Sequence, residues 1–528
     1  MILVLLGIKY LIFLILAYVI FRLFGGLIAG DRAFSPVFRK RGWSNIKLAP
    51  LLVFAVVLLY QVKILYFEKP GLLGKIIEQE DKRKWNRDRY FERGKILDRN
   101  GIVLAESNLE SEFLRNYPYV EETAHLLGYF LPGSKVRTGI ERIFNERLSG
   151  EIASGFTLLH PFRFAKNFSS IYIKGDDLDL SIDAVLQKTA YEGLAGRKGA
   201  AVGIDPETGD ILFLVSSPGF DPHILFEDSA YNNKKIRQKA QLNRAVNGLY
   251  EPGSTFKVIV AAAAIEKGQD RFRINCTNEG FVPGGVIRAV TDHGNEFHGD
   301  IGLERAIIKS CNVYFAQLGI RLTEEVVKEY AEKFLFNTDI SMRGSRDILK
   351  PGKSFFPPLG NIDENALAWS SIGQYQLQIT PLHMAVIAAI IANDGVFVEP
   401  KIEKNIRRGD RDRIIARDTA VSLRKMMQEV VGDPNNDLHG PPTWEARERF
   451  GTGWKAKVQG LPIAGKTGTA ENPHGEPHAW FMGFAPVENP KIAFAFVVEN
   501  GGYGGDVSGP IAKQVLQKAV ELGYFRDK

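Results

Sequence analysis

The chain has 528 residues, of which 45% are hydrophobic and 24% are charged, so its composition is that of a globular protein with a sizeable core and excludes a disordered or fibrous one. Its net charge of +6 is small for this length and comes without a polybasic tail, which makes nucleic acid an unexpected partner. Two cysteines allow at most one disulfide bridge and exclude a four-thiolate zinc site.

Two apolar segments near the N-terminus are long enough to cross a bilayer. Residues 1–30 carry only Lys9 and Arg22 as charged side chains, and residues 48–67 are apolar apart from one glutamine and one lysine. The loop 31–47 between them is rich in lysine and arginine, so the positive-inside rule places it in the cytoplasm and the rest of the chain outside. A signal sequence or an interfacial helix at residues 1–30 is the alternative, because Lys9 and Arg22 are costly at mid-bilayer.

Residues 68–183 show no pattern that indicates chemistry. Residues 71–93 are highly charged and lack an apolar helical stripe, which indicates a juxtamembrane stalk. From residue 94 onward, short β-like runs, among them residues 138–150 (TGIERIFNERLSG), alternate with turns, and no nucleophile and base stand at a useful spacing. We expect a stalk followed by a small, β-rich, noncatalytic module.

From residue 184 to the C-terminus, two apolar hairpins enclose a run of helical patterns. Residues 199–217 form one hairpin around the turn PETG, and residues 479–500 form another around VENP. The clearest helical patterns cover residues 254–267, 302–320, 381–393, 419–431 and 510–522. Residues 184–528 are therefore predicted to form an α+β domain with a central antiparallel sheet covered by helices.

The first candidate for chemistry is Ser254 with Lys257, in the sequence EPGSTFK. A Pro-Gly break precedes an alanine-rich helical run, so the two side chains lie at i and i+3 on one face of the first turn. A lysine whose pKa is lowered can take the proton of a serine hydroxyl, and the helix N-terminus favours developing negative charge. Because S-x-x-K occurs by chance on the order of once or twice in such a chain, an N-cap serine and a solvated lysine are the alternative.

The second candidate is Ser310 with Asn312, in KSCNVYFAQLG, where one helical run ends and another begins. A second hydroxyl could relay a proton between the lysine and a leaving group, and the amide can both donate to and accept from a peptide. S-x-N also occurs by chance about once in a chain of this size.

The third candidate is the sequence GKTGT at residues 465–469. A strand here would line a cleft with the charge of Lys466, two threonine hydroxyls and the backbone N–H groups exposed by a glycine, which suits a carboxylate and an oxyanion. Residues 460–467 also match the Walker A pattern of nucleotide-binding loops. Glycines and prolines follow within a dozen residues, so no helix can begin at Lys466 and we reject the nucleotide site.

Taken in chain order, S-x-x-K at Ser254, S-x-N at Ser310 and K-T-G at Lys466 resemble the three motifs of the penicillin-binding transpeptidases and serine β-lactamases. RGKILDRNGIVLA and TGIERIFNERLSG resemble the pedestal of the class B penicillin-binding proteins, and stretches such as NRAVNGLYEPGSTFK resemble their transpeptidase domain. No glycosyltransferase domain fits between residue 67 and the pedestal, which disfavours a bifunctional class A protein.

The resemblance implies a peptidoglycan D,D-transpeptidase anchored in the bacterial cytoplasmic membrane, with its catalytic domain on the extracytoplasmic side. Ser254 would attack the carbonyl of the penultimate D-alanine of a stem peptide, with Lys257 as general base and Ser310 passing the proton. An amine of a neighbouring stem would then take the acyl group. The implied substrate-binding residues are Asn312, Lys466, Thr467, Gly468 and Thr469. The backbone N–H groups of Ser254 and Thr469 would form the oxyanion hole.

The resemblance also implies partners and leaves alternatives open. The expected partners are stem peptides ending in D-Ala-D-Ala, β-lactam antibiotics, the lipid bilayer and a polytopic membrane glycan polymerase, with no metal or organic cofactor. A D,D-carboxypeptidase or β-lactamase would send the same acyl-enzyme to water, and a β-lactam sensor would keep it; whether the role is in elongation, division or a specialised process stays open. Cys276 and Cys311 form either one bridge or two free thiols, and His298 is expected to be structural.

Overall fold

The computed structural model describes residues 91–526, except for 109–114, 131–135, 150–172, 224–241, 286–287, 343–350, 359–362, 408, 410, 433–450 and 474. The chain divides into two compact units, Met1–Arg83 and Lys84–Lys528, and every described residue belongs to the second. The predicted membrane segments 1–30 and 48–67 and the loop between them lie outside the described residues. Among the helices that are described, none has both the length and the apolar character needed to cross a bilayer.

The first part of the second unit is a small module of short strands and helices. Its strands are β1 Phe91–Glu92, β2 Ile96–Leu97, β3 Val103–Ser107, β4 Arg115–Asn116, β5 Ile173–Lys174 and β6 Leu178–Asp179. The sheet order is β4-β3-β2-β6, and β1 pairs separately with β5. Its helices are α4 Val120–Leu127, α5 Gly139–Ile143 and α6 Asn145–Ser149. The β-like assignment of residues 138–150 is wrong, because this segment forms α5 and α6, and that the module is noncatalytic stays a prediction.

A buried charge cluster explains why this segment is helical. Glu141, in α5, is fully buried, and its carboxylate oxygens accept hydrogen bonds from Arg93 Nε at 2.6 Å and Arg115 Nε at 2.7 Å. Burial alone would raise the pKa of Glu141, but the two guanidiniums hold it below its ordinary value. The helical turn places this carboxylate inside the module, where the neighbouring Ile140 is also buried. These tertiary contacts override the β-like pattern of the local sequence.

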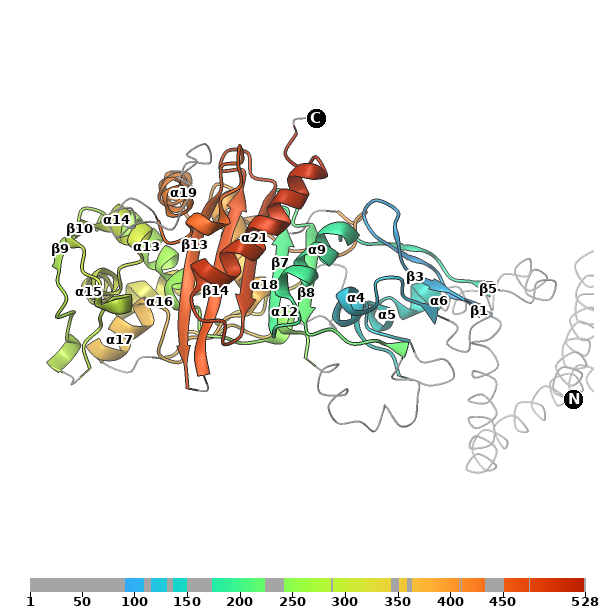
Figure 1. Ribbon diagram of the computed structural model, residues 1–528, viewed down its shortest axis with the longest axis horizontal. Helices are drawn as coiled ribbons and strands as arrows, with labels where there is room; N and C mark the ends of the chain where they lie inside the picture. Colours follow the sequence, from blue (N-terminus) through green and yellow to red (C-terminus); the bar gives the residue numbers. More distant parts are fainter. Residues whose placement is uncertain are drawn as a thin grey trace, which may run out of the picture. The chain divides into compact units, whose positions relative to one another are not determined.

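The rest of the second unit is built on a five-stranded antiparallel sheet with the order β13-β14-β15-β7-β8 (Figure 1). The strands are β7 Gly199–Ile204, β8 Ile211–Ser217, β13 Ala464–Asn472, β14 Gly475–Ala485 and β15 Ile492–Val498. Both predicted hairpins are confirmed, and they join through the antiparallel pairing of β15 with β7. β13 lies at one edge of the sheet, so one side of its backbone pairs with no other strand among the described residues.

Helices cover both faces of this sheet. α9 Ala184–Leu194 and α21 Gly504–Glu521 pack together against β8 and β14, and Figure 1 shows α21 lying across the strands. α18 Pro381–Ala392 is apolar almost all round and buried, and it packs against β15 and β7. An α-helix that is hydrophobic on every side belongs in a core, so the fold has helix, sheet and helix layers.

The remaining described helices and strands include those that carry the S-x-x-K and S-x-N motifs. They are α12 Arg244–Asn247, η4 Gly253–Phe256, α13 Lys257–Glu266, β9 Arg273–Cys276, η5 Pro283–Gly285, η6 His293–Asn295, β10 Gly299–Gly302, α14 Leu303–Lys309, α15 Asn312–Leu322, α16 Glu324–Lys333, α17 Glu364–Ser371, β11 Val396–Val398, β12 Arg411–Arg413, α19 Arg417–Val431 and η7 Trp454–Ala456. The mixed α+β architecture predicted for this region is confirmed.

Two predicted helices differ from the structure in ways that affect the site. The pattern over residues 302–320 is interrupted at Ser310, whose φ of 58° lies in the left-handed region and ends α14. The last helix begins at Gly504, six positions before the predicted start at Pro510. A Cβ atom at Gly504 would lie 2.2 Å from the carbonyl oxygen of Trp480, so this glycine serves close packing against the sheet and does not break the helix.

Candidate active site

Ser254 lies in a tight 3-10 turn, η4, which is followed directly by α13. Gly253 makes this turn possible, because its φ is 54° and a Cβ atom there would lie 2.6 Å from the carbonyl oxygen of Thr469 on β13. The backbone N–H of Gly253 donates to the carbonyl of Gly373 at 2.9 Å. The nucleophile candidate is thus held against the edge strand. Ser254 is half-buried, and its hydroxyl makes no hydrogen bond to the described residues.

Lys257 is fully buried, so the alternative of a solvated lysine is wrong. Its Nζ donates to the carbonyl of Ser310 at 2.6 Å, to Asn312 Oδ1 at 2.6 Å and to Ser310 Oγ at 3.4 Å. Burial lowers the pKa of Lys257 to about 8, against the opposing effect of Asp292 and Cys311, which favour the charged form. A lysine with this pKa exchanges protons readily near neutral pH.

Ser310 joins the two lysines of the predicted motifs. Its left-handed conformation between α14 and α15 lets the hydroxyl accept from Lys466 Nζ at 2.8 Å on one side and from Lys257 Nζ on the other. Lys466 is also fully buried and donates to the carbonyl of Thr467 at 2.9 Å. Burial, together with the charge of Lys257, lowers the pKa of Lys466 well below its ordinary value. Because the pKa values of both lysines are lowered, the hydroxyl between the two amines is placed to pass a proton from one to the other.

Asn312 is fixed by residues that the sequence did not single out. Its Nδ2 donates to the carbonyl of Thr291 at 2.9 Å, and its backbone N–H donates to Asp292 Oδ1 in a short hydrogen bond. The carboxylate of Asp292 also favours the charged form of Lys257 and so opposes the lowering of its pKa. No motif in the sequence marks Asp292, since its contacts depend on the loop that precedes β10.

The K-T-G-T residues lie on β13, as predicted, and no helix begins there, so the segment lacks the helix that a nucleotide loop needs; that it binds no nucleotide stays a prediction. Thr467 is buried and its hydroxyl shares a 2.7 Å hydrogen bond with Thr452. Gly468 allows close packing, because a Cβ atom there would lie 3.0 Å from the carbonyl oxygen of Pro252 and 2.9 Å from Thr255. Thr469 is half-buried, and its hydroxyl accepts from the N–H of Gly504 at 3.5 Å.

Four side chains behind the S-x-N motif could hold a metal ion. Cys276, Asp292, His298 and Cys311 place one potential ligand atom each within 4.8 Å of one another. Two sulfurs, an imidazole nitrogen and a carboxylate oxygen are a donor set that suits zinc. Both cysteines are free thiols with their sulfurs 3.6 Å apart, which decides between the two alternatives that the sequence left open. That catalysis needs no metal stays a prediction.

The structure therefore brings together residues from all three motifs. Lys257, Ser310, Asn312 and Lys466 form one hydrogen-bonded group, and Ser254 and Thr469 lie beside each other at the turn of Gly253. This arrangement combines a partly exposed hydroxyl, a buried amine with a lowered pKa and a strand edge that can bind a peptide. It can support acyl transfer through a serine ester.

Comparisons with known proteins agree with this chemistry. Residues 199–517 match the family described as penicillin binding protein transpeptidase domain, and residues 93–159 match the penicillin binding protein A dimerisation domain. The peptidoglycan D,D-transpeptidase PbpA of Mycolicibacterium smegmatis is 32% identical over 461 residues, covering 82% of this chain and 90% of the relative. The peptidoglycan D,D-transpeptidase MrdA of Acinetobacter baumannii is 28% identical, covering 77% of this chain and 66% of the relative.

Solved structures show the same similarity. The ceftriaxone acyl-enzyme complex of penicillin-binding protein A from M. tuberculosis superimposes with a TM-score of 0.68 at 30% identity, covering 82% of this chain and 100% of that one. The imipenem acyl-enzyme complex of the same protein gives a TM-score of 0.67 at 30% identity, covering 82% of this chain and 100% of that one.

Proposed function

Because the chain belongs to the penicillin-binding protein transpeptidase family and is a serine-type peptidoglycan D,D-transpeptidase, we propose that Ser254 is its nucleophile and Lys257 its general base. The observation that carries this assignment is the burial of Lys257, whose pKa is lowered to about 8 at the turn that holds Ser254. Lys257 takes the proton of Ser254 as the hydroxyl attacks the carbonyl carbon of the penultimate D-alanine.

The tetrahedral intermediate then needs stabilisation and a proton donor. The backbone N–H groups of Ser254 and Thr469 donate to the oxyanion. Ser310 passes the proton from Lys257 to the amine of the terminal D-alanine as the peptide bond breaks. This relay is supported by the position of the Ser310 hydroxyl between Lys257 Nζ and Lys466 Nζ. The product is an ester between Ser254 and the shortened stem peptide, with free D-alanine released.

Substrate binding falls to β13 and Asn312. The terminal carboxylate of the stem peptide binds at Lys466, Thr467 and Thr469, with Gly468 giving it access to the strand. A carboxylate beside the buried Lys466 restores the charged form of that amine, because an opposite charge raises the pKa of a lysine. Asn312 holds the peptide backbone. In the second step an amine of a neighbouring stem attacks the ester carbon and gives a proton to Lys257, the bond to Ser254 breaks, and Lys257 passes that proton to Ser254.

Cross-linking by the full-length chain tests these roles. The protein in detergent is incubated with a soluble peptide ending in D-Ala-D-Ala and an amine acceptor, and the released D-alanine and the joined product are measured by mass spectrometry. Ser254→Ala is expected to abolish both products, and Ser149→Ala, which changes a half-buried serine of α6 outside the three motifs, is the matched control that keeps them. Release of D-alanine with water as the only acceptor contradicts a transpeptidase and indicates a carboxypeptidase.

The position of the chain in the cell is part of the same proposal. We infer that residues 1–30 and 48–67 span the cytoplasmic membrane, that residues 31–47 face the cytoplasm, and that the stalk and module 68–183 and the catalytic domain 184–528 lie outside. Hydropathy and the lysine and arginine content of the short loop support this topology. A polytopic glycan polymerase is the membrane partner proposed to supply the polymer. Labelling of single introduced cysteines in intact cells tests the topology, and a C-terminus reached only from the cytoplasm contradicts it.

A further inference from the structure

Thr452 belongs to none of the three motifs, yet its hydroxyl lies 2.7 Å from the hydroxyl of Thr467 on β13. The two threonines are 15 positions apart in the chain, and Thr452 stands between two glycines just before η7. Thr467 is one of the residues to which the proposed function assigns the terminal carboxylate of the stem peptide. Thr452 is therefore the hydrogen-bonding neighbour of a proposed substrate contact.

The backbone around Thr452 is held by three helices. Its N–H donates to the carbonyl of Ile308 in α14 at 3.4 Å, and the next N–H, that of Gly453, donates to the carbonyl of Val430 in α19 at 2.9 Å. In α21, a Cβ atom on Gly505 would lie 2.3 Å from the carbonyl oxygen of Thr452, so this helix packs directly against the backbone. The fold itself thus places the side chain of Thr452 beside β13.

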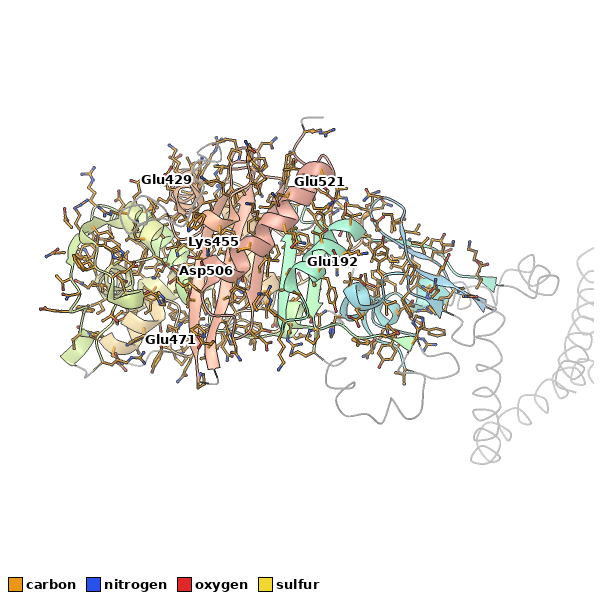
Figure 2. All side chains as sticks on the ribbon, in the orientation of Figure 1. Glu192, Glu429, Lys455, Glu471, Asp506 and Glu521 are labelled. Carbon is orange, nitrogen blue, oxygen red and sulfur yellow. The ribbon has the colours of Figure 1, made fainter. Side chains whose placement is uncertain are left out.

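An ion pair holds the following residues against the same helix. Lys455 Nζ, in η7, lies 2.6 Å from Asp506 Oδ1, in the first turn of α21, and Figure 2 shows the two side chains next to each other. None of these contacts uses the hydroxyl of Thr452. A variant that loses only this hydroxyl is therefore expected to keep the position of the segment.

The direction of the hydrogen bond between the two hydroxyls matters for substrate binding. Thr467 and Thr469 lie two positions apart on β13 and so share one face of the strand. The hydroxyl of Thr469 accepts from the backbone N–H of Gly504 at 3.5 Å, which leaves its own proton available. A threonine hydroxyl has a single proton, so Thr467 can donate to a carboxylate only when Thr452 is the donor in their pair. Among the described residues, Thr452 is the one hydrogen-bond partner of the Thr467 hydroxyl.

We propose that Thr452 is a positioning residue for the terminal carboxylate: its hydroxyl donates to Thr467 Oγ1, and the proton of Thr467 is thereby directed to the substrate. Without substrate either hydroxyl can be the donor, and the carboxylate selects one direction. Hydrogen bonds in such a row strengthen one another, and the bond that ends on a charged group is the strongest. Thr452 acts through Thr467 and does not touch the substrate. This inference rests on the proposed function and adds a residue that favours a free carboxyl end.

Acylation of the full-length chain in detergent by two forms of penicillin G tests this row of hydroxyls. The acid carries the carboxylate, its methyl ester does not, and the reacting lactam is the same in both. The second-order rate constant for each is measured by the loss of sites that a fluorescent penicillin still labels. Thr452→Val is expected to lower the rate constant about tenfold for the acid and by no more than about threefold for the ester, because a hydrogen bond to a neutral group is weaker.

Three further variants define the role of the hydroxyl. Thr452→Ser keeps a hydroxyl and is expected to keep both rate constants within about twofold of the wild-type values. Thr189→Val is the matched control: it removes a hydroxyl that donates to the carbonyl of Val185 at 2.8 Å within α9, and it should keep both rate constants. In Thr467→Val, the addition of Thr452→Val should cause no further loss, because Thr452 acts only through Thr467.

The outcomes separate this inference from the proposed function. Equal losses for the acid and the ester in Thr452→Val, an unchanged rate constant for the acid, or a further loss in the double variant each overturn the inference and leave the proposed function standing. Circular dichroism checks the fold, and Thr452→Ala, which also lacks the hydroxyl, replaces Thr452→Val if that variant is unfolded. If the wild type reacts equally fast with the acid and the ester, the carboxylate site at Lys466 and Thr467 falls and the inference falls with it.

Discussion

Lys257 Nζ lies 2.6 Å from Asn312 Oδ1, although 55 positions separate the two residues in the chain. This contact joins the first turn of α13 to the first residue of α15 and buries the amine next to the hydroxyl of Ser310. Sequence spacing cannot show such a contact, and it turns two short motifs, each of which occurs by chance, into one hydrogen-bonded group.

The pKa of Lys257 predicts the pH dependence of acylation. A general base must be neutral, and the pKa of Lys257 is lowered to about 8, so the neutral fraction falls as pH decreases below that value. The second-order rate constant for penicillin acylation is expected to decrease by about tenfold per pH unit below about pH 8 and to level off above it. Stopped-flow measurements between pH 6 and 9.5 check this, and a flat profile contradicts the role of Lys257.

Removal of the Ser310 hydroxyl is expected to slow acylation while the protein stays folded. The hydroxyl accepts from Lys466 Nζ at 2.8 Å and lies near Lys257 Nζ, so Ser310→Ala breaks the proton relay. The rate constant for acylation should fall by about 10²-fold to 10⁴-fold. Circular dichroism and the unfolding midpoint confirm that the variant is folded. An acylation rate constant within threefold of the wild-type value would show that Ser310 does not relay the proton.

Gly253 is expected to be indispensable for the position of Ser254. In Gly253→Ala the new Cβ atom would lie 2.6 Å from the carbonyl oxygen of Thr469, at a φ of 54°, so we expect a loss of about 1–3 kcal/mol in the free energy of unfolding and slower acylation. Gly101→Ala is the control, because Gly101 also has a positive φ, 85°, but nothing lies within 4 Å of its added Cβ atom. Gly101→Ala should lower the free energy of unfolding by about 1 kcal/mol and leave the rate of acylation unchanged. Equal effects of the two variants on acylation contradict the role of Gly253.

The buried carboxylate of Glu141 is expected to hold the small module together. Glu141→Gln leaves Arg93 and Arg115 buried without a counter-charge, and the expected loss is about 3–5 kcal/mol in the free energy of unfolding. Glu106→Gln is the control: Glu106 pairs with Lys95 at 2.9 Å, but both side chains are more than a third exposed, so the loss should stay below about 1 kcal/mol. Denaturant titration, monitored by tryptophan fluorescence, measures the free energy of unfolding of both variants. Similar losses in the two variants contradict the role of Glu141 in holding the module together.

The sequence predicted the parts of this protein that depend on local pattern. The hairpins around PETG and VENP are apolar runs that alternate with clear turns, and Lys466 to Thr469 lie on a strand as expected. Long-range contacts were not predictable. Asp292 carries no motif, yet it binds the backbone N–H of Asn312, and the break at Ser310 depends on a left-handed conformation that only tertiary packing supports in a residue with a side chain.

The sequence pattern also could not predict helices of five residues. α5 and α6 are too short to show a helical period, and α5 is held by the ion pairs of Glu141 with Arg93 and with Arg115 of β4. Likewise, Gly504 is a glycine that favours a loop when viewed locally, but it lies within α21 because no other side chain fits against the carbonyl of Trp480.

The most direct test of the central claim is a labelling experiment with a fluorescent penicillin on the full-length chain, with wild type and Ser254→Ala run side by side and the label chased for at least an hour. We predict a durable labelled band in the wild type and no band in folded Ser254→Ala. A band that persists in the variant, or a label lost within minutes from the wild type, would contradict a transpeptidase that acts through a slowly hydrolysed ester at Ser254.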